Sequence, residues 1–279
     1  MKPKKPLWKT VAVALGKILL ALAFWGFLWY LLSARIGIEF LFPSPKAVFS
    51  ELWLLVTERS ESLVRYGVQY SFWYITFVSL LRVVWGVLIS ILLGCLLAYL
   101  TTASRLLHTL ISPALSAVKA TPVASFIILA MLWLQKSILP VFITALIVVP
   151  IVWANVSEGI RAVDGDLREV ATVYRFSPGK KITRLYLPTV APYFFAACQS
   201  ALGMAWKASV AAEILAVPQY SIGTELFLSK QYMLSTTLFA WTLVVILLSL
   251  VIEKLFVFGL KALGRKLGVI AKGDSYADT

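Results

Sequence analysis

Residues 168–188 read REVATVYRFSPGKKITRLYLP, a charged and turn-rich segment that lies between two long apolar runs. Residues 168–174 are predicted to form a short helix. A turn is expected at 177–179, because proline fixes φ and glycine accepts the left-handed conformation. A second helical piece over 180–187 is expected to end before Pro188, since the residue before a proline disfavours the α region. The segment is therefore predicted to be a compact helix–turn–helix that faces a partner.

The composition excludes an ordinary soluble domain. The 279 residues are 60% hydrophobic and 14% charged, and the mean hydropathy is +0.87, whereas soluble domains carry about 25% charged residues. A transmembrane helix needs roughly 17 to 25 mostly apolar residues. The sequence predicts an all-α, polytopic membrane protein with about six transmembrane helices, from apolar runs at 10–33, 83–99, 120–135, 137–157, 185–206 and 231–252.

Lysine and arginine indicate the orientation. If segment 168–188 is cytoplasmic, the predicted inside segments hold more than twice as many of these residues as the outside segments, in line with the positive-inside rule. Both termini are then expected in the cytoplasm. The predicted order is a cytoplasmic tail over 1–9, a first transmembrane helix over 10–33, an outer loop with an interfacial helix over 34–70, a transmembrane core over 71–258 that includes a cytoplasmic loop over 159–190, and a cytoplasmic tail over 259–279.

The formal net charge of +13 does not indicate nucleic-acid binding. Basic patches do neutralise phosphates, but these cations flank the predicted spans, where they meet anionic lipid headgroups. Cys95 and Cys198 fall within predicted spans and are interpreted as packing residues rather than a disulfide. No spacing typical of a metal site is present, and no cofactor is expected.

Segment 168–188 resembles the cytoplasmic "EAA" loop of bacterial ABC-importer permeases, which opens with E-A-A and closes with I-x-L-P. Glu169-Val170-Ala171 matches the opening and residues 185–188 (LYLP) match the close. The sequence is most similar to the branch associated with nitrate, sulfonate, taurine and related molecules, which has the type I importer fold. The family usually has glycine where this chain has Arg175, so the bend is expected to be made by residues 177–179 instead.

The resemblance implies the permease subunit of an ATP-driven importer in the bacterial inner membrane. It implies a homodimer, a separate ATP-binding subunit and an external or periplasmic solute-binding protein. The solute expected is small and organic: a sulfonate, a nitrate-like anion or a heterocyclic precursor. The chain has no G-x-x-x-x-G-K-[ST] phosphate loop, so it is predicted not to be an enzyme and to have no catalytic residue. The residues implied to contact the ATPase are Glu169, Ala171, Tyr174, Arg175, Ser177, Pro178, Gly179, Leu187 and Pro188.

The third predicted span begins with residues 112–113, ahead of its apolar run, and contains a second proline at 122. It is expected to kink or break because proline removes backbone donors. A broken helix is tolerated in a membrane where it lines a cavity or is buried in protein. A kink that serves only packing is the alternative, and the sequence does not separate the two. The candidate pathway residues on this span are Ser116, Lys119, Thr121, Pro122 and Ser125.

Lys207 and Glu213 are charges inside the fifth predicted span, where each costs about 2.5 to 3.5 kcal/mol and usually faces protein or water. Six positions apart on a helix, they lie roughly 240° from each other and are not expected to pair. Lys207 either attracts an anionic solute or has a buried stem with a partner for its ammonium, and the second reading is preferred. The resemblance suggests a structural or gating role for Glu213. Arg82, near a span end, is expected to extend to water and to be structural.

Three other classes of membrane protein are less consistent with this sequence. A secondary transporter would usually be longer, with paired halves, and no internal repeat is visible. An intramembrane enzyme needs convergent acids, a His–Ser pair or metal ligands, and His108 is the only histidine. A membrane scaffold does not need a turn-built cytoplasmic loop such as segment 168–188. The leading alternative to the importer is a secondary transporter or scaffold without an ATPase.

Overall fold

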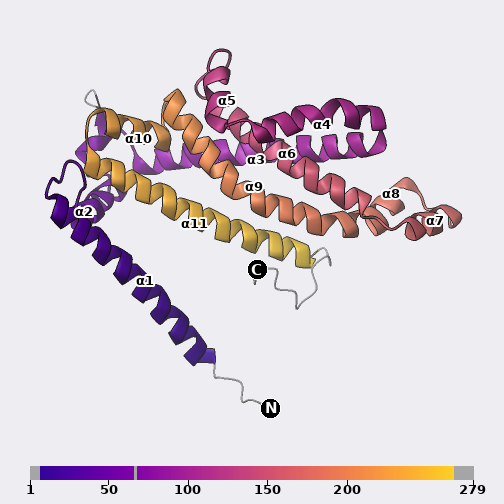
Figure 1. Ribbon diagram of the computed structural model, residues 1–279, viewed down its shortest axis with the longest axis horizontal. Coiled ribbons are helices and arrows are strands. Elements are labelled where there is room, and N and C mark those ends of the chain that lie inside the picture. The colour runs from indigo at the N-terminus through magenta and orange to yellow at the C-terminus, as the bar shows by residue number, and fades with distance from the viewer. Residues whose placement is uncertain (1–6, 66–67, 267–279) are drawn as a thin grey trace. The chain divides into compact units, whose positions relative to one another are not determined.

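A computed structural model describes residues 7–65 and 68–266 of the chain (Figure 1). The described part is helical apart from one hairpin of two short strands, which confirms the all-α prediction. The chain divides into two compact units, which are described separately. The first consists of Met1–Phe72 and Leu228–Val244, and the second of Trp73–Phe227 and Val245–Thr279.

The first unit contains the predicted first helix and outer loop. Its elements are α1 (Leu7–Ile36), α2 (Pro45–Val56), a 3-10 turn (Glu61–Leu63) and the antiparallel strands β1 (Val64–Arg65) and β2 (Val68–Gln69). α2 is the helix predicted as interfacial. It starts where it does because the Ser44 hydroxyl accepts a hydrogen bond from the Ala47 N–H at 3.3 Å and Pro45 occupies the first turn.

Aromatic side chains and one carboxylate hold this unit together. The Trp29 indole N–H donates to the Pro43 carbonyl at 3.1 Å, and its ring stacks on Phe239 at 6.2 Å. Glu51 accepts hydrogen bonds from the hydroxyls of Ser60 at 2.6 Å and Thr237 at 3.2 Å. Residues distant in sequence are thereby fixed around the loop between α1 and α2.

The second unit contains most of the membrane core. Its helices are α3 (Phe72–Ala103), α4 (Arg105–Ala120), α5 (Val123–Ala130), α6 (Leu139–Arg161), α7 (Gly165–Val173), α8 (Pro178–Lys181) and α9 (Leu187–Ala216), with parts of α10 (Ile222–Gln231) and α11 (Ser235–Lys266). α6 packs along α9. Alanines of α9, such as Ala208 and Ala212, lie buried against Ile143 of α6, because small residues let membrane helices approach closely.

Two glycines bring α3 against α6. A Cβ on Gly86 would fall 2.6 Å from Cβ of Thr144, and one on Gly94 would fall 2.7 Å from Cβ of Val152. The second contact lies eight residues after the first on both helices, so α3 and α6 run parallel and end at the same side as α7 and α8 (Figure 1). The predicted inside segments at the start of α4 and the end of α6 therefore lie near the α7–α8 loop.

The third predicted span is broken, as its prolines predict. The chain bends by 105° between α4 and α5, at Thr121 and Pro122. Pro113, in contrast, lies inside α4 without ending it. Pro122 has no N–H to donate, and its extended ψ of 133° turns the chain away from the α4 axis.

The number of long apolar helices is lower than the six predicted. In the described residues, four helices are long and apolar enough to cross a membrane, or five if the bent pair counts as one span. α9 is long enough but is not among them, because prolines, polar residues and two charges interrupt its apolar run. Much of α9 is buried in protein, so it needs less lipid-facing surface.

Both ends of the predicted order differ in detail. α1 extends beyond the expected 10–33 at each end, and α11 continues to Lys266, so residues 259–266 of the predicted tail are helical. Residues 1–6 and 267–279 of the predicted tails lie outside the described residues.

Candidate functional site

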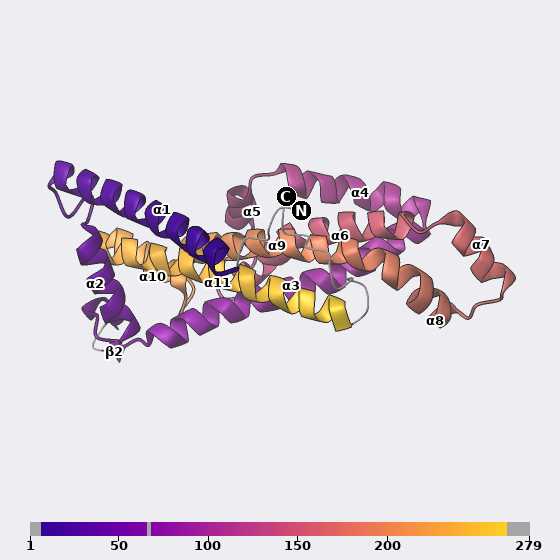
Figure 2. The same cartoon turned by 90° about the horizontal axis from the view of Figure 1, so that it is seen from below.

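The segment between α6 and α9, residues 162–186, folds as a small module that projects past the ends of these two helices (Figure 2). Its first helix, α7, is capped by Asp164, whose carboxylate accepts a hydrogen bond from the Asp166 N–H at 2.9 Å. The predicted helix–turn–helix is present, and it is a packed unit rather than a loose connection. Its buried core consists of Val163, Ala171 and Leu185, with Phe176 and Tyr186 packed against it.

The bend after α7 is made by Arg175. This residue has φ of +49°, the left-handed conformation that most often falls to glycine after a helix. The Phe176 N–H donates to the Ala171 carbonyl at 2.9 Å and the Arg175 N–H to the Thr172 carbonyl at 3.0 Å, which is the Schellman motif. The expectation that residues 177–179 replace the missing glycine is therefore wrong. Gly179 lies inside α8, and the arginine adopts the conformation itself.

Replacing Arg175 by glycine is expected to stabilise the module. An L-residue in the left-handed region costs roughly 1 to 2 kcal/mol, and part of this is offset by the larger entropy of glycine in the unfolded chain. We expect a net gain of about 0.5 to 1 kcal/mol, measured by thermal unfolding of the purified protein. Thr172→Gly, inside α7, is the control and should lower stability by about 1 kcal/mol. A loss of stability with Arg175→Gly would contradict the reading of this bend.

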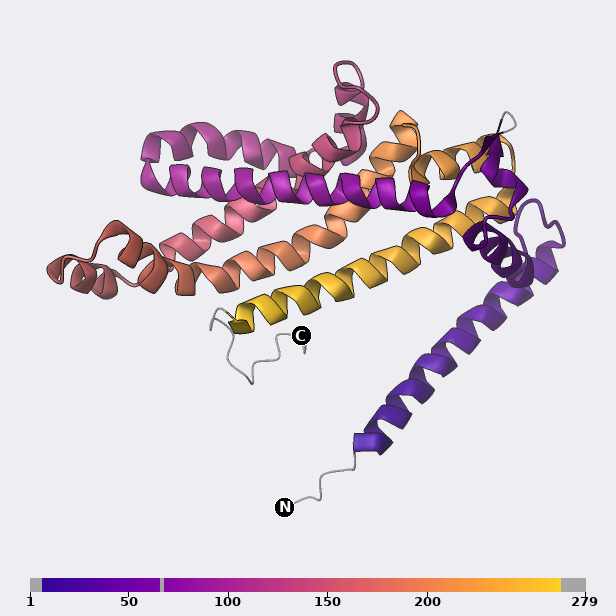
Figure 3. The same ribbon diagram turned by 180° about the vertical axis from the view of Figure 1, so that it is seen from behind.

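Pro188 does not end the helix that precedes it. Residues Ile182–Tyr186 form a π-helical turn, in which the Leu187 N–H donates to the Ile182 carbonyl, and α9 follows directly (Figure 3). A proline ring clashes with the carbonyl four residues earlier in an α-helix, and the wider turn relieves this clash. The predicted end before Pro188 is therefore wrong, and α8 continues through this turn into α9.

α7 exposes an apolar surface. Val173 and Tyr174 are 79% and 74% exposed, and Leu167 and Val170 are about half exposed. α7 is not among the helices that are long and apolar enough to cross a membrane, and an exposed apolar surface of this kind marks a contact with another protein or with a membrane. Of the residues predicted to contact an ATPase, Ala171 is buried in the core of the module, whereas the others are exposed: Glu169, Tyr174, Arg175, Ser177, Pro178, Gly179, Leu187 and Pro188.

The predicted pathway residues of the broken span lie at its break. Thr121 closes α4, since both its N–H and its hydroxyl donate to the Ala117 carbonyl, at 3.1 and 2.8 Å. It is half-buried, and the other four residues are exposed: Ser116, Lys119, Pro122 and Ser125.

Lys207 and Glu213 have opposite environments on α9. Lys207 is exposed, and no hydrogen bond or ion pair involves it among the described residues. The preferred reading of a buried, partnered Lys207 is therefore wrong for the single chain. It lies on one face of α9 with small residues at helical spacing, Ala196, Ser200 and Gly203, and a Cβ on Gly203 would meet nothing within 4 Å.

Glu213 is completely buried and joins three helices. One carboxylate oxygen, Oε1, accepts from Nη1 of Arg82 at 3.0 Å, and Oε2 accepts from the Ser79 hydroxyl at 2.9 Å and the Gly223 N–H at 3.2 Å. Glu213 and Lys207 do not pair, as their spacing predicts. The network connects α3, the end of α9 and the start of α10.

Arg82 is directed into the protein instead of toward water. Its side chain is only 11% exposed, and besides Glu213 it donates to the carbonyls of Gln219 at 2.9 Å and Tyr220 at 3.1 Å. The structural role predicted for Arg82 is present, but its partner was missed, as were Ser79 and Gly223. Two opposite charges in separate apolar spans were the available signal, since such charges pair when they are buried.

Comparison with known proteins decides the family. Residues 90–268 match the model of the family described as "Binding-protein-dependent transport system inner membrane component". The chain belongs to this family. A solved structure, "Crystal structure of an amino acid ABC transporter with histidines", has the same fold, with a TM-score of 0.56 over 68% of this chain and 91% of that one, at 16% identity.

Similar members of this permease family are curated. The chain is 30% identical to the bicarbonate transport system permease protein CmpB of Synechococcus elongatus, over 62% of this chain and 63% of that protein. It is 28% identical to the nitrate import permease protein NrtB of the same species, over 67% of each. It is 29% identical to the putative aliphatic sulfonates transport permease protein SsuC of Bacillus subtilis, over 50% of each. The match to CmpB thus covers less than two thirds of that relative.

Proposed function

We propose that this chain is the permease subunit of an ATP-driven, binding-protein-dependent importer for a small anion. The module at residues 162–186 is the observation that carries this proposal. It has a buried core of its own, it continues through the π-helical turn into α9, and it exposes apolar side chains outside the apolar helices. A module of this kind transmits movement of a bound partner to the transmembrane helices as a rigid body.

The partner proposed for the module is a separate ATP-binding subunit. α7 presents Val170, Val173 and Tyr174, and Glu169 lies beside them in sequence. Closure of two ATP-binding subunits would bring two such modules together and favour a different arrangement of the spans, a population shift driven by differential binding. ATP hydrolysis then occurs on that subunit, and an external solute-binding protein delivers the solute.

The solute pathway is proposed to run along the exposed face of α9 between two copies of this chain. This face carries Lys207 with small residues around it, so a second copy can approach closely. The named substrates of three relatives, bicarbonate, nitrate and aliphatic sulfonates, are all small oxyanions. An exposed cation on the pathway attracts such an ion, which favours an anionic solute over a neutral heterocycle.

The module is proposed to be cytoplasmic, as are both termini. Arg105 at the start of α4 and Arg161 at the end of α6 lie near the module. The module itself carries Arg168, Lys180 and Lys181. This concentration of cations at one end supports a cytoplasmic position.

Substitutions that introduce charge on the apolar surface of α7 are expected to abolish its contact with the ATPase. Val173→Asp with Tyr174→Asp places two carboxylates in what would become a dry interface, where an unpaired charge costs several kcal/mol. Co-purification of a tagged permease with the ATP-binding subunit expressed from the same operon measures the effect. The matched control is Val173→Ile with Tyr174→Phe, which should retain the ATPase. If no ATPase accompanies the unchanged protein, a secondary transporter or scaffold becomes the better account.

A further inference from the structure

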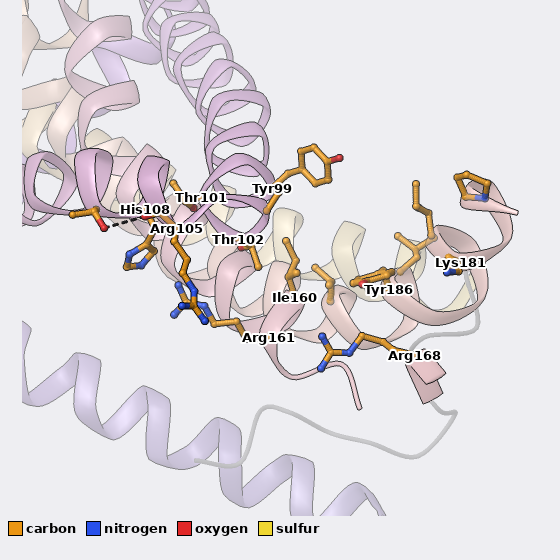
Figure 4. A pocket seen from close by; sticks show the side chains of 16 residues that line it. Tyr99, Thr101, Thr102, Arg105, His108, Ile160, Arg161, Arg168, Lys181 and Tyr186 are labelled. Carbon is orange, nitrogen blue, oxygen red and sulfur yellow. Dashed lines mark hydrogen bonds between the residues drawn. The ribbon is translucent and has the colours of Figure 1, made fainter. Parts of the chain in front are cut away.

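A pocket of about 1200 Å³ lies between the junction of α3 with α4, the end of α6 and the α7–α8 module (Figure 4). The junction is fixed by the Trp153 indole, which donates to the Thr101 hydroxyl at 2.8 Å. Residues from six α-helices and from the π-helical turn line this pocket, and none of them belongs to the predicted solute pathway. The pocket is also much larger than a small inorganic ion requires.

Four cations from four helices converge on the pocket. Arg105 lies in the first turn of α4, Arg161 in the last turn of α6, Arg168 on α7 and Lys181 on α8. In Figure 4 the three arginine side chains extend toward the same side of the pocket. No aspartate or glutamate lines it, and none of the four cations is in an ion pair within the described part of the chain. Lys181 has one neutral partner, the Thr172 hydroxyl at 3.4 Å.

Part of the remaining lining is an apolar wall, formed by Ile160 of α6, Ile182 of the π-helical turn, and Leu187 and Val190 of α9. Threonines, tyrosines and His108 also line the pocket. The N-terminus of α4 adds the partial positive charge of a helix end. A ligand that fits both the cations and the apolar wall has a phosphate group and a hydrocarbon part. The guanidinium groups bind the phosphate in bidentate fashion, and the hydrocarbon part contacts the apolar wall.

We propose that this pocket binds an anionic phospholipid of the cytoplasmic leaflet through its phosphate headgroup. Basic pockets between transmembrane helices on this side are suited to such headgroups. A soluble phosphate compound has the same charged group but no hydrocarbon part to contact the apolar wall. The proposal goes beyond the transport function. It rests on the proposed cytoplasmic position of the module only for the choice of leaflet that supplies the lipid.

A bound lipid and an ATPase can occupy the module together. At about 100° per residue, Arg168 lies on the face of α7 opposite to Val170, Val173 and Tyr174. The lipid would therefore contact one face of α7 and the ATPase the other, and two of the residues implied to contact the ATPase, Pro178 and Leu187, would contact the lipid instead. A phosphate held by Arg105, Arg161 and Arg168 would connect α4, α6 and the module. It would therefore restrict movement of the module relative to α4 and α6.

Native mass spectrometry of the purified importer complex in detergent, with phosphatidylglycerol or phosphatidylcholine added in equal amounts, tests this proposal. The unchanged protein should retain phosphatidylglycerol in clear excess. Arg105→Gln with Arg161→Gln should lower its affinity about 30-fold, since each cation near an anionic headgroup contributes about fivefold. The matched control, Arg59→Gln with Lys136→Gln, removes two exposed cations outside the pocket and should retain the lipid.

The outcomes separate the two sources of phosphate. Glycerol 3-phosphate and inorganic phosphate serve as soluble competitors, and neither should displace the lipid. If either displaces it, or if phosphatidylcholine is retained equally by the unchanged protein, the lipid proposal is overturned. Arg105→Lys with Arg161→Lys, which keeps the charge but loses the bidentate geometry, should retain more of the binding than the glutamine variant. ATPase co-purification is scored separately, so failure of this proposal is distinct from failure of the proposed function.

Discussion

Glu213→Gln is expected to lower the free energy of unfolding by about 3 to 5 kcal/mol, because it leaves the largely buried Arg82 guanidinium without its counter-charge. The carboxylate also accepts hydrogen bonds from Ser79 and from the Gly223 N–H, and the amide can satisfy only part of this set. The loss should be visible as a lower midpoint of thermal unfolding in detergent and as poorer recovery of folded protein.

A double-mutant cycle isolates the ion pair. Arg82→Gln removes the cation, and Arg82→Gln combined with Glu213→Gln removes both charges. The double variant should be more stable than the sum of the two single losses by roughly 1 to 3 kcal/mol, since no unpaired charge remains. Strict additivity would show that Arg82 and Glu213 do not interact, and the network that joins α3 to α9 and α10 would have to be abandoned.

Gly223→Ala is expected to be the second severe change. A Cβ at this position would overlap the Cβ of Glu213 and approach the Ile214 backbone nitrogen to 2.5 Å, and backbone cannot move aside as a flexible side chain can. Overpacking of this kind costs about 1 to 3 kcal/mol or more, measured again by thermal unfolding. It should also weaken the Glu213 network, since the start of α10 must shift.

A glycine in open surroundings provides the control for Gly223. Gly259 lies in α11, and a Cβ there would meet nothing within 4 Å. Gly259→Ala should be neutral or stabilise the helix by up to about 1 kcal/mol. Equal losses at Gly223 and Gly259 would show that close packing of α10 on α9 is not the reason for glycine at 223.

Most of the fold follows from local sequence. The apolar runs predict the helices, and Thr121 and Pro122 predict the break between α4 and α5, because a missing N–H acts within its own turn. The bend at Arg175 is not predictable from propensity, which favours glycine in the left-handed region. Here the Schellman hydrogen bonds and the small core of the module override that preference. Pro188 was misread for a similar reason, since a π-turn that accommodates a proline is not visible in the residue pattern.

The site was predictable only where it is local. The exposed loop residues Glu169 and Tyr174 belong to one short segment, so their pattern alone indicates a contact surface. Glu213 and Arg82 are far apart in sequence. Two opposite charges in separate apolar spans indicate a possible pair, but they do not indicate the hydrogen bonds from Ser79 and the Gly223 N–H. The exposed position of Lys207 depends on how α9 packs against α6. Spacing along one helix does not specify that contact.

Transport by reconstituted protein tests the central claim most directly. The permease is placed in proteoliposomes with the ATP-binding subunit and the solute-binding protein encoded beside it, and uptake of labelled bicarbonate, nitrate and an alkanesulfonate is measured with and without ATP. The account predicts uptake of one of these anions that requires ATP and the binding protein, and that is lost in the Val173→Asp, Tyr174→Asp variant. Uptake that continues without ATP, or that the variant leaves unchanged, would contradict it.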